Sequence, residues 1–354
     1  MRILHVGTDS FGGYGGIALY NRELIAAMAS HPSVEEVVVV PRIIVGEIEA
    51  LPDKVTFVSA ASRGRLAYLN ALRGARGRFD LVVCAHVNLL PIVRLITKHP
   101  LLMLYGIEAW KPLRDPLSNR LLRNVRGVIS ISEITSERFI GWSRYGGPSL
   151  LLPNSIRAEW YGIRPKNGHF LKRYRLDGKR VLMTLGRVIA AERYKGFDEV
   201  LDVLPELDDD ISYLIAGGGN DVTRLRRKAS DLGVTNRVVF TGLFPEDEKA
   251  DLYNLADVYV MPSRGEGFGF VFLEALACGV PVIASRLDGG REAVRMGGLG
   301  RLVDPTSPAE IRMAILDTLA SGGTKTIPEG LDFFSYTNFE RRTHAIIDAF
   351  ASNA

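Results

Sequence analysis

The chain has 354 residues, of which 47% are hydrophobic and 24% charged, the composition of a globular protein long enough for two domains. No apolar run approaches the roughly eighteen residues of a membrane span, which argues against an integral membrane protein. The formal net charge of +4 conceals a local excess of basic residues, since twelve basic and three acidic residues lie from Arg63 to Arg126. That excess indicates an anionic partner, such as phospholipid headgroups, a lipid-linked phosphate or nucleic acid, unless it is a solvated arginine-rich surface.

The first residues and the cysteines indicate the cytoplasm. Met1 and Arg2 run directly into the strand-like segment ILHVG, without the small-residue cleavage site of a secretion signal. Cys84 and Cys278 lie in apolar surroundings, far apart in the sequence. We therefore expect two buried free thiols in a reducing compartment.

Short apolar runs alternate with amphipathic segments along the chain. This alternation predicts parallel sheets covered by helices on both faces, and the runs fall into two sets. We expect strands in the first set within residues 3–7, 34–40, 81–85, 101–106 and 127–132, and in the second within 181–186, 212–219, 238–242, 258–263 and 281–285.

The two sets are separated by a connector at 158–180, which mixes Gly, Pro, aromatic and charged residues without a sustained period. The sequence therefore predicts one doubly wound domain at 1–157 and another at 158–335. The amphipathic segment 336–354 is expected to be a helix that could pack on either domain. Ligands of such sheets bind in loops after the strands, so two open α/β domains would present these loops at a shared cleft.

The first such loop, GTDSFGGYGGIALYN, leads glycines into a helix N-terminus, where backbone amides can meet a phosphate or sugar. Gly13, Gly15 and Ala18 also fit a dinucleotide fingerprint, but the second strand ends in Pro41 and Arg42 rather than in an acidic residue. A plain glycine turn is the structural alternative.

The second loop, TLGRVIAAERYKGFDEV, carries two cations. Arg187 follows the strand directly and Lys195 comes eight residues later, before a glycine. A guanidinium fork and an ammonium point charge in one loop are suited to a diphosphate, although loops are often basic.

The third loop reads RGEGFGFVFLEALACG and begins at Arg264. Gly267 and Gly269 admit close backbone contact, and a helix starting near Phe270 would offer unpaired amides to phosphate oxygens. Glu274 could accept hydrogen bonds from two vicinal hydroxyls, and Glu266 could reach a second polyol. A capping carboxylate beside an exposed helix residue is an equally simple explanation of the two glutamates.

Other clusters indicate no metal chemistry. Asp208, Asp209 and Asp210 precede a strand, so they belong to the opposite end of the sheet from the other loops. The histidines lack paired metal-ligand spacing. We expect neither a metal nor a cofactor.

Five ordered motifs together resemble the retaining glycosyltransferases of family 4, also called group 1, which have the GT-B fold. They are GGIALYNREL, LPNS, GRVIAAERYKG, VVFTGLFPEDEKADLYNLADVYVMPS and RGEGFGFVFLEALACGVPVIAS. The resemblance is strong between Val181 and Pro305 and weaker before. It implies an α/β protein of two doubly wound Rossmann-like domains facing a central cleft, with the acceptor on the first domain and a nucleotide-sugar donor on the second.

The resemblance also implies roles for individual residues. Arg187 and Lys195 would neutralise the diphosphate in place of a metal, and Glu266 would hold a sugar hydroxyl near the developing charge. Glu274 would bind the ribose hydroxyls. The further donor contacts would be the amides of Gly267, Phe268, Gly269, Phe270 and Val271, the base-bordering Leu243 and Phe244, and Gly15 and Gly16 over the phosphates.

The acceptor side departs from the family pattern. Many relatives carry a histidine at the end of the strand that here reads LLMLYGIEAW, where Tyr105 stands instead. His86 follows a different strand and is not an obvious replacement. His86, Tyr105 and Glu108 are our candidates for the acceptor side, and Trp110 could serve there or in packing.

The resemblance implies a retaining, metal-independent enzyme that moves a hexose from a UDP- or GDP-sugar to a polysaccharide, glycolipid or lipid-linked acceptor. The basic region would suit a lipid pyrophosphate or an anionic membrane, with contacts from Arg114, Arg120, Arg123 and Arg126. Such contacts would make this a peripheral protein at the inner face of the membrane. We expect no nucleic acid partner. The alternatives are a GT-B epimerase or phosphorylase and an NADP-binding oxidoreductase that uses the Gly13 loop with Arg42.

Overall fold

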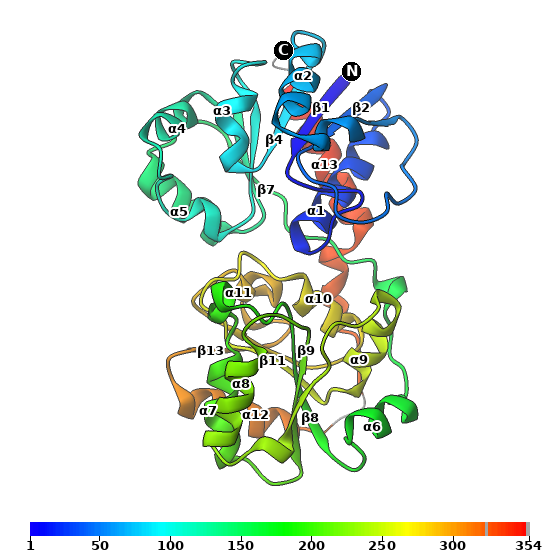
Figure 1. The fold of residues 1–354 in the computed structure, drawn as a ribbon, viewed down its shortest axis with the longest axis vertical. Coiled ribbons are helices and arrows are strands. Elements are labelled where there is room, and N and C mark those ends of the chain that lie inside the picture. Colours follow the sequence, from blue (N-terminus) through cyan, green and yellow to red (C-terminus); the bar gives the residue numbers. More distant parts are fainter. Residues whose placement is uncertain (323–324, 352–354) are drawn as a thin grey trace. The chain divides into compact units, whose positions relative to one another are not determined.

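The computed structural model describes residues 1–322 and 325–351, and contacts divide the chain into two compact units (Figure 1). Unit 1 comprises residues 1–155 together with 336–354, and unit 2 comprises residues 156–335. The predicted helix at 336–354 is described as far as residue 351, and residues 352–354 lie outside the described part.

Unit 1 is built on a seven-stranded parallel sheet with the order β3-β2-β1-β4-β5-β6-β7. Leu4 of β1 is in register with Val38 on one side and Val82 on the other. The strands are β1 (Arg2–Gly7), β2 (Glu36–Pro41), β3 (Val55–Phe57), β4 (Leu81–Ala85), β5 (Leu101–Leu104), β6 (Gly127–Ser130) and β7 (Ser149–Leu151).

Helices cover the sheet of unit 1, and the last of them comes from the C-terminal segment. Tyr20 of α1 packs edge-on against Phe339 of α13, with ring centroids 5.5 Å apart. The helices of unit 1 are α1 (Gly16–Ala29), α2 (Arg65–Ala75), α3 (Leu90–Val93), α4 (Pro116–Leu121), α5 (Glu133–Ser143) and α13 (Tyr336–Ala351).

Unit 2 has a six-stranded parallel sheet with the order β10-β9-β8-β11-β12-β13. The strands are β8 (Arg180–Leu185), β9 (Ile211–Ala216), β10 (Val238–Phe240), β11 (Val258–Met261), β12 (Val282–Ser285) and β13 (Arg301–Val303). The helices are α6 (Gly168–Tyr174), α7 (Phe197–Val203), α8 (Val222–Asp231), α9 (Lys249–Leu255), α10 (Phe270–Ala277), α11 (Gly290–Ala293) and α12 (Pro308–Ala320).

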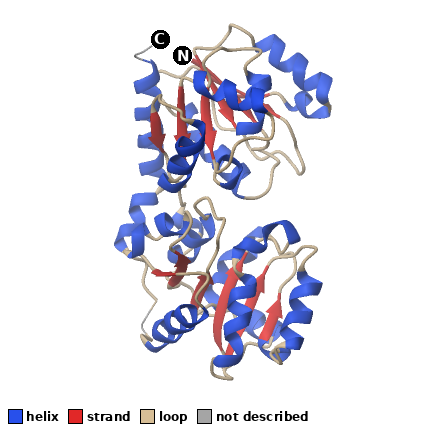
Figure 2. Cartoon of the chain, turned by 90° about the vertical axis from the view of Figure 1, so that its left-hand side faces the viewer, coloured by secondary structure: helices blue, strands red, loops and turns tan. Residues whose placement is uncertain are grey.

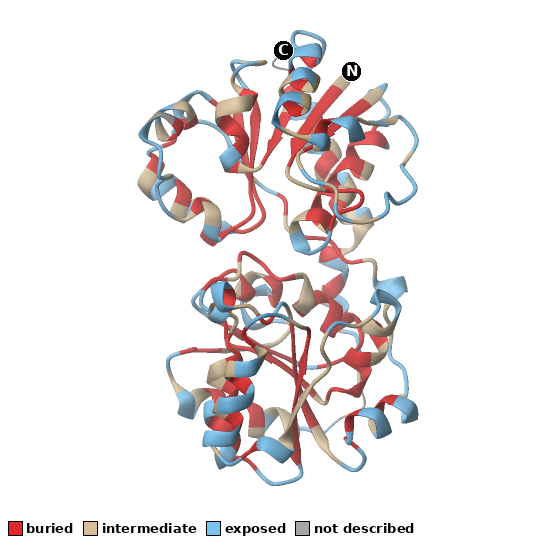
Figure 3. Ribbon diagram, in the orientation of Figure 1, coloured by how far each residue is buried: buried red, intermediate tan, exposed pale blue. Residues whose placement is uncertain are grey.

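The strands β9 and β11 are buried along their whole length, and the other central strands nearly so, because helices lie on both faces of each sheet (Figures 2 and 3). Each predicted apolar run contains a strand, and the predicted doubly wound α/β class is confirmed. Cys84 and Cys278 are buried and free, as predicted. Among the described residues, no helix combines the length and hydropathy that a membrane crossing requires.

Candidate functional site

The strand order marks where unit 2 can bind a ligand. The order reverses between β8 and β11, and these strands are followed by the loops at 186–196 and 262–269. Doubly wound sheets bind ligands at the carboxyl ends of the strands where the order reverses. The second and third loops that the sequence indicated therefore flank this switch point.

The loop at 186–196 carries both predicted diphosphate cations, and both contact Glu192. Arg187 forms an ion pair with Glu192, although the Arg187 side chain is 72% exposed. Lys195 Nζ lies 3.6 Å from Glu192 Oε2 and 3.8 Å from Glu266 Oε2. The structure thus brings Arg187 and Lys195 together at Glu192, and Lys195 also lies beside Glu266. Sequence reasoning missed Glu192, although its charge stands in the quoted loop.

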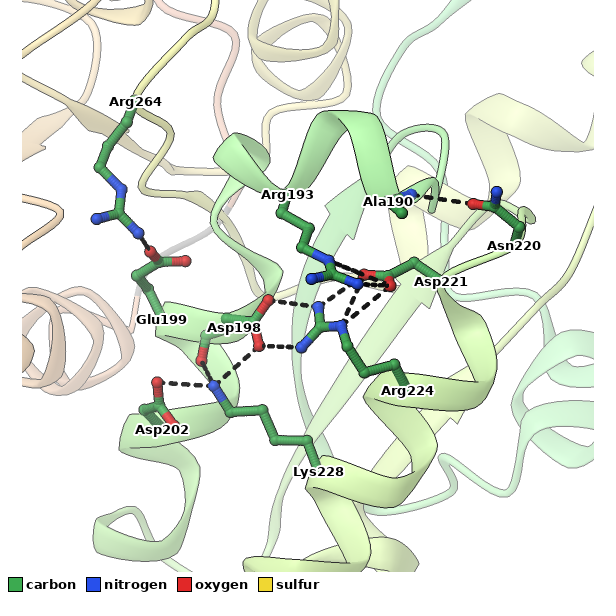
Figure 4. A network of polar contacts seen from close by, with 10 residues as sticks. All are labelled: Ala190, Arg193, Asp198, Glu199, Asp202, Asn220, Asp221, Arg224, Lys228 and Arg264. Carbon is green, nitrogen blue, oxygen red and sulfur yellow. Dashed lines mark hydrogen bonds and ion pairs between the residues drawn. The ribbon is translucent and has the colours of Figure 1, made fainter.

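A network of ion pairs around the buried Asp221 holds this loop in place (Figure 4). Asp221 is 4% exposed and accepts hydrogen bonds from Arg193 of the loop and from Arg224 of α8, with a shortest N to O distance of 2.7 Å for each. Hydrogen bonds from Arg224 and Arg193 lower the pKa of Asp221 to about 2. Arg224 also pairs with Asp198 of α7. The loop at 186–196 is therefore attached to α7 and α8.

The segment before α10 presents free backbone amides. Gly269, the N-cap residue of α10, has a φ of 94°, in the left-handed region that favours glycine. The amides of residues 267–271 donate no hydrogen bond to any described residue. Phe268 can contribute only its backbone, because its side chain is buried against Phe334. These amides and the positive end of the helix dipole form a binding site for anionic oxygens.

Glu274 is already hydrogen-bonded within unit 2. Its carboxylate is buried and accepts from Tyr161 Oη at 2.9 Å, Lys249 Nζ at 2.7 Å and Tyr253 Oη at 2.7 Å. Sequence reasoning missed these three partners. Lys249 and Tyr253 are four residues apart on α9, a spacing that places both on one helix face. Ribose hydroxyls would have to join or replace these donors, so the predicted ribose contact remains a prediction.

Leu243 and Phe244 follow β10, at the edge of the sheet. Leu243 is 88% exposed and lies beside Gly218, in the loop that follows β9. A large apolar side chain that is open to solvent beside a glycine loop can border a planar base. The predicted contact with a base stays a prediction.

In unit 1 the order reverses between β1 and β4, so the loops after these strands flank its switch point. Gly15, with a φ of 89°, is the N-cap residue of α1, and Gly15 and Gly16 are both exposed. His86 follows β4, and its Nδ1 accepts a hydrogen bond from the Asn88 amide at 3.1 Å. Burial lowers the pKa of His86, so the neutral imidazole is favoured.

Tyr105 and Glu108 are tied into the fold of unit 1. Tyr105 is buried, and its hydroxyl donates to Asn21 Oδ1 at 2.6 Å. Glu108 Oε1 accepts from the amides of Tyr105 at 2.6 Å and Gly106 at 3.2 Å, while burial raises the pKa of Glu108. His5 Nε2 lies 3.2 Å from the same Asn21 Oδ1, a neighbour that sequence reasoning missed. Tyr105, His5 and Asn21 therefore form a buried polar cluster, which contacts the glycine loop through a hydrogen bond from Asn21 to the Asp9 carbonyl.

The two remaining candidates, Trp110 and Arg42, make contacts within unit 1. Trp110 Nε1 donates to Thr135 Oγ1 at 3.0 Å, so its polar atom is used inside unit 1. The Arg42 guanidinium, which the oxidoreductase hypothesis requires for a phosphate, lies over the Tyr68 ring at 5.6 Å.

Two Rossmann-like units with these loops define a protein of the GT-B glycosyltransferase fold, and solved structures of that class superimpose on the chain. Anabaena HepE, solved in complex with UDP, gives a TM-score of 0.77 at 19% identity and covers 99% of this chain and 100% of its own. Residues 171–326 match the family model described as glycosyl transferases group 1. This region, most of unit 2, is therefore a group 1 glycosyltransferase domain.

Two relatives by sequence come from mycobacteria. The GDP-mannose-dependent alpha-(1-6)-phosphatidylinositol monomannoside mannosyltransferase of Mycolicibacterium smegmatis is 36% identical over 222 residues, 58% of this chain and 57% of the relative. The phosphatidyl-myo-inositol mannosyltransferase of Mycobacterium tuberculosis is 31% identical over 253 residues, 68% of this chain and 64% of the relative. The chain thus matches less than two thirds of the length of each.

Proposed function

We propose that the protein is a retaining, metal-independent glycosyltransferase that moves a hexose, with mannose as the first candidate, from a nucleotide-sugar to a lipid-linked acceptor. The observation that carries the proposal is the convergence of Arg187, Lys195 and Glu266 beside the free amides of residues 267–271, at the switch point of unit 2. GDP-mannose is the first donor to test, because the Mycolicibacterium relative is named for it. A UDP-sugar is the second.

The two cations would act on the leaving group. When the bond between the anomeric carbon and the diphosphate breaks, negative charge accumulates on the phosphate oxygens. Lys195, with a side chain only 16% exposed, would act in a low-dielectric setting, whereas Arg187 would act nearer to solvent. This positive charge supports a mechanism without a metal. Glu266 would hold a sugar hydroxyl. The acceptor oxygen would form the new bond to the anomeric carbon, and its proton would pass to the departing diphosphate.

The acceptor would bind unit 1. Lipid-linked acceptors are favoured by the phosphatidylinositol-based names of both mycobacterial relatives and by the basic region of residues 63–126. Arg114, Arg120 and Arg123 are exposed and stay candidates for contact with an anionic lipid. Arg126 is no longer a candidate, because its guanidinium donates to the Phe350 carbonyl and lies over the Phe350 ring at 5.7 Å.

The first test is calorimetric titration of the protein with GDP, UDP, ADP and NADPH in the presence of EDTA. We expect one nucleoside diphosphate to bind and Lys195→Ala to lose that binding. Binding that requires a divalent ion would contradict the metal-independent mechanism, and binding of NADPH alone would favour the oxidoreductase.

The second test measures transfer from GDP-mannose to phosphatidylinositol mannosides in vesicles. We expect a product whose anomeric configuration, read by NMR, is that of the donor. Inversion would contradict the retaining mechanism. Conversion of the donor sugar without any acceptor would indicate the epimerase instead.

A further inference from the structure

Asp288 lies in the loop between β12 and α11, where sequence reasoning singled out no residue. Its side chain is fully buried, with 0% exposure. A carboxylate in such a position is costly unless hydrogen bonds compensate for its desolvation. The partners of Asp288 therefore indicate what the carboxylate holds in place.

Both oxygens of Asp288 accept hydrogen bonds. Oδ2 accepts from Ser263 Oγ at 2.7 Å and from the backbone amide of Glu266 at 2.8 Å. Oδ1 accepts from the amide of Gly290 at 3.0 Å, at the start of α11. The carboxylate thus connects α11 to the residue immediately before the free amides. It fixes the backbone from which the Glu266 side chain extends.

The neighbouring glycine strengthens this connection. The amide of Gly289 donates to the Glu266 carbonyl at 2.9 Å, so both polar groups of the Glu266 backbone are bound from the same loop. A Cβ added at Gly289 would lie 2.0 Å from the Gly267 carbonyl oxygen. Only glycine permits this close approach. The loops at 262–269 and 286–289 therefore form one rigid unit.

We propose that Asp288 is a positioning residue that holds Glu266 in the orientation required for sugar transfer. This proposal rests on the proposed function, because it assigns Asp288 a task in that reaction. Asp288 need not touch the donor, since its oxygens are used by Ser263, Glu266 and Gly290. Loss of the carboxylate should therefore affect turnover more than nucleotide binding, because the cations of the other loop remain in place.

The charged form of Asp288 is the form that holds the loop. All three of its partners donate hydrogen bonds, and a carboxylate accepts at both oxygens, whereas a carboxylic acid carries a proton on one oxygen and must also donate. Desolvation by burial, partly offset by the Glu266 amide and the Ser263 hydroxyl, raises the pKa of Asp288 to about 7. Glu266 raises the pKa of Asp288 further as a like charge, and the Asp288 carboxylate in turn contributes to the raised pKa of Tyr194. Protonation below about pH 7 should loosen the loop.

The test compares the parent with Asp288→Asn and Ser263→Ala, each assayed for kcat, KM and GDP affinity from pH 5.5 to 8.5. An asparagine retains one oxygen and places an amide group against an N–H donor, so we expect kcat to fall about tenfold or more with GDP affinity within about threefold of the parent. The acid limb of the parent's kcat profile should be absent. Ser263→Ala removes a hydrogen bond to the charged form, so its acid limb should shift to higher pH.

The matched control is Asp257→Asn. Asp257 Oδ2 also accepts from a backbone amide and a side chain, those of Val181 and Lys166, both at 2.7 Å. It directly precedes β11 and so lies at the amino-terminal end of the strands, opposite the end at which Asp288 lies. This variant should lose stability while its kcat and the position of its acid limb stay those of the parent.

Each outcome decides a separate claim. A parent that neither binds a nucleoside diphosphate nor transfers sugar would contradict the proposed function. An active parent with an Asp288→Asn variant of equal kcat and an unchanged acid limb would contradict the positioning role alone. If Asp288→Asn does not fold, Ser263→Ala decides, because an acid limb identical to that of the parent would also contradict it.

Discussion

Lys195 is the more enclosed of the two cations at the switch point of unit 2. Its side chain is 16% exposed and its Nζ lies between Glu192 and Glu266, whereas the Arg187 side chain is 72% exposed. Electrostatic stabilisation of a leaving group is larger where solvent is excluded. The two cations should therefore differ in what they contribute to turnover.

We expect Lys195→Ala to lower kcat about a hundredfold or more and Arg187→Ala to lower it less, because solvent screens the exposed guanidinium. Steady-state kinetics with GDP-mannose measures both. The control is Lys172→Ala, an exposed lysine in the last turn of α6, which should keep the parent's rate. Equal rates for Lys195→Ala and the parent would remove this loop from the catalytic site.

Glu192 gives a second prediction at the same site. Removal of its charge should improve ligand binding, whereas removal of either cation should lower turnover. Its carboxylate pairs with Arg187 and lies 3.6 Å from Lys195 Nζ, so it competes with a diphosphate for both cations. We expect Glu192→Gln to tighten GDP binding roughly fivefold, about 1 kcal/mol, since the partner arginine is exposed and screened. Titration calorimetry measures the change.

The matched control for Glu192 is Glu206→Gln, which removes a carboxylate that pairs with Arg312 at 3.3 Å. Glu206 is the last residue of η7 (Leu204–Glu206), which precedes β9 and so lies at the opposite end of the sheet from the loop at 186–196. Its affinity for GDP should equal that of the parent. If Glu192→Gln weakens GDP binding instead, Glu192 orients the cations rather than competing with the ligand.

Individual charges were predictable from the sequence only where they stand in a recognisable loop. Arg187, Lys195 and Glu266 could be named because each follows a strand. Asp288 could not, because its partners are mostly backbone amides, which carry no signature in the sequence. The partners that occupy Glu274 were hidden for another reason, since they depend on how α9 packs against α10.

At the scale of elements, α9 and α10 are joined by a buried ion pair. The side chains of Lys249 and Glu274 are 13% and 2% exposed. Removal of one partner from such a pair leaves an uncompensated buried charge.

We expect Lys249→Met to destabilise the protein by about 3 kcal/mol, measured by denaturant unfolding without nucleotide. The double variant Lys249→Met with Glu274→Gln should regain much of this stability, because it removes the uncompensated charge as well. A single variant as stable as the parent would show that the pair contributes nothing net.

The sequence predicted long strands well and short ones poorly. The runs that became β1, β2 and β9 hold six strand residues each, with a continuous apolar pattern. The strands β3, β7 and β13 have three residues each, are partly exposed and were not predicted. The strand β10 also has three residues, but the apolar run at 238–242 predicted it. Three residues cannot establish a period, so such edge strands depend on pairing with a neighbour that is already in place.

At the scale of the whole molecule, each unit has its own core. One buried cluster joins residues between Leu4 and Tyr145, and another joins residues between Leu182 and Ile315. The C-terminal helix α13 belongs to unit 1. Its Phe339 is fully buried and packs against Tyr20 of α1. Because the cores are separate, a ligand that contacts unit 2 should stabilise unit 2 directly.

We therefore expect GDP at about a hundred times its dissociation constant to raise the stability of unit 2 by about 2.7 kcal/mol, and Phe339→Ala to lower that of unit 1 by about 3 kcal/mol or more. Hydrogen exchange read by mass spectrometry distinguishes the units, since peptides from β9 and β11 report on unit 2 and peptides from β1 and β4 on unit 1. GDP should slow exchange in the first pair and Phe339→Ala should accelerate it in the second. Protection by GDP confined to β1 and β4 would place the nucleotide on unit 1 and reverse the assignment of donor and acceptor sides.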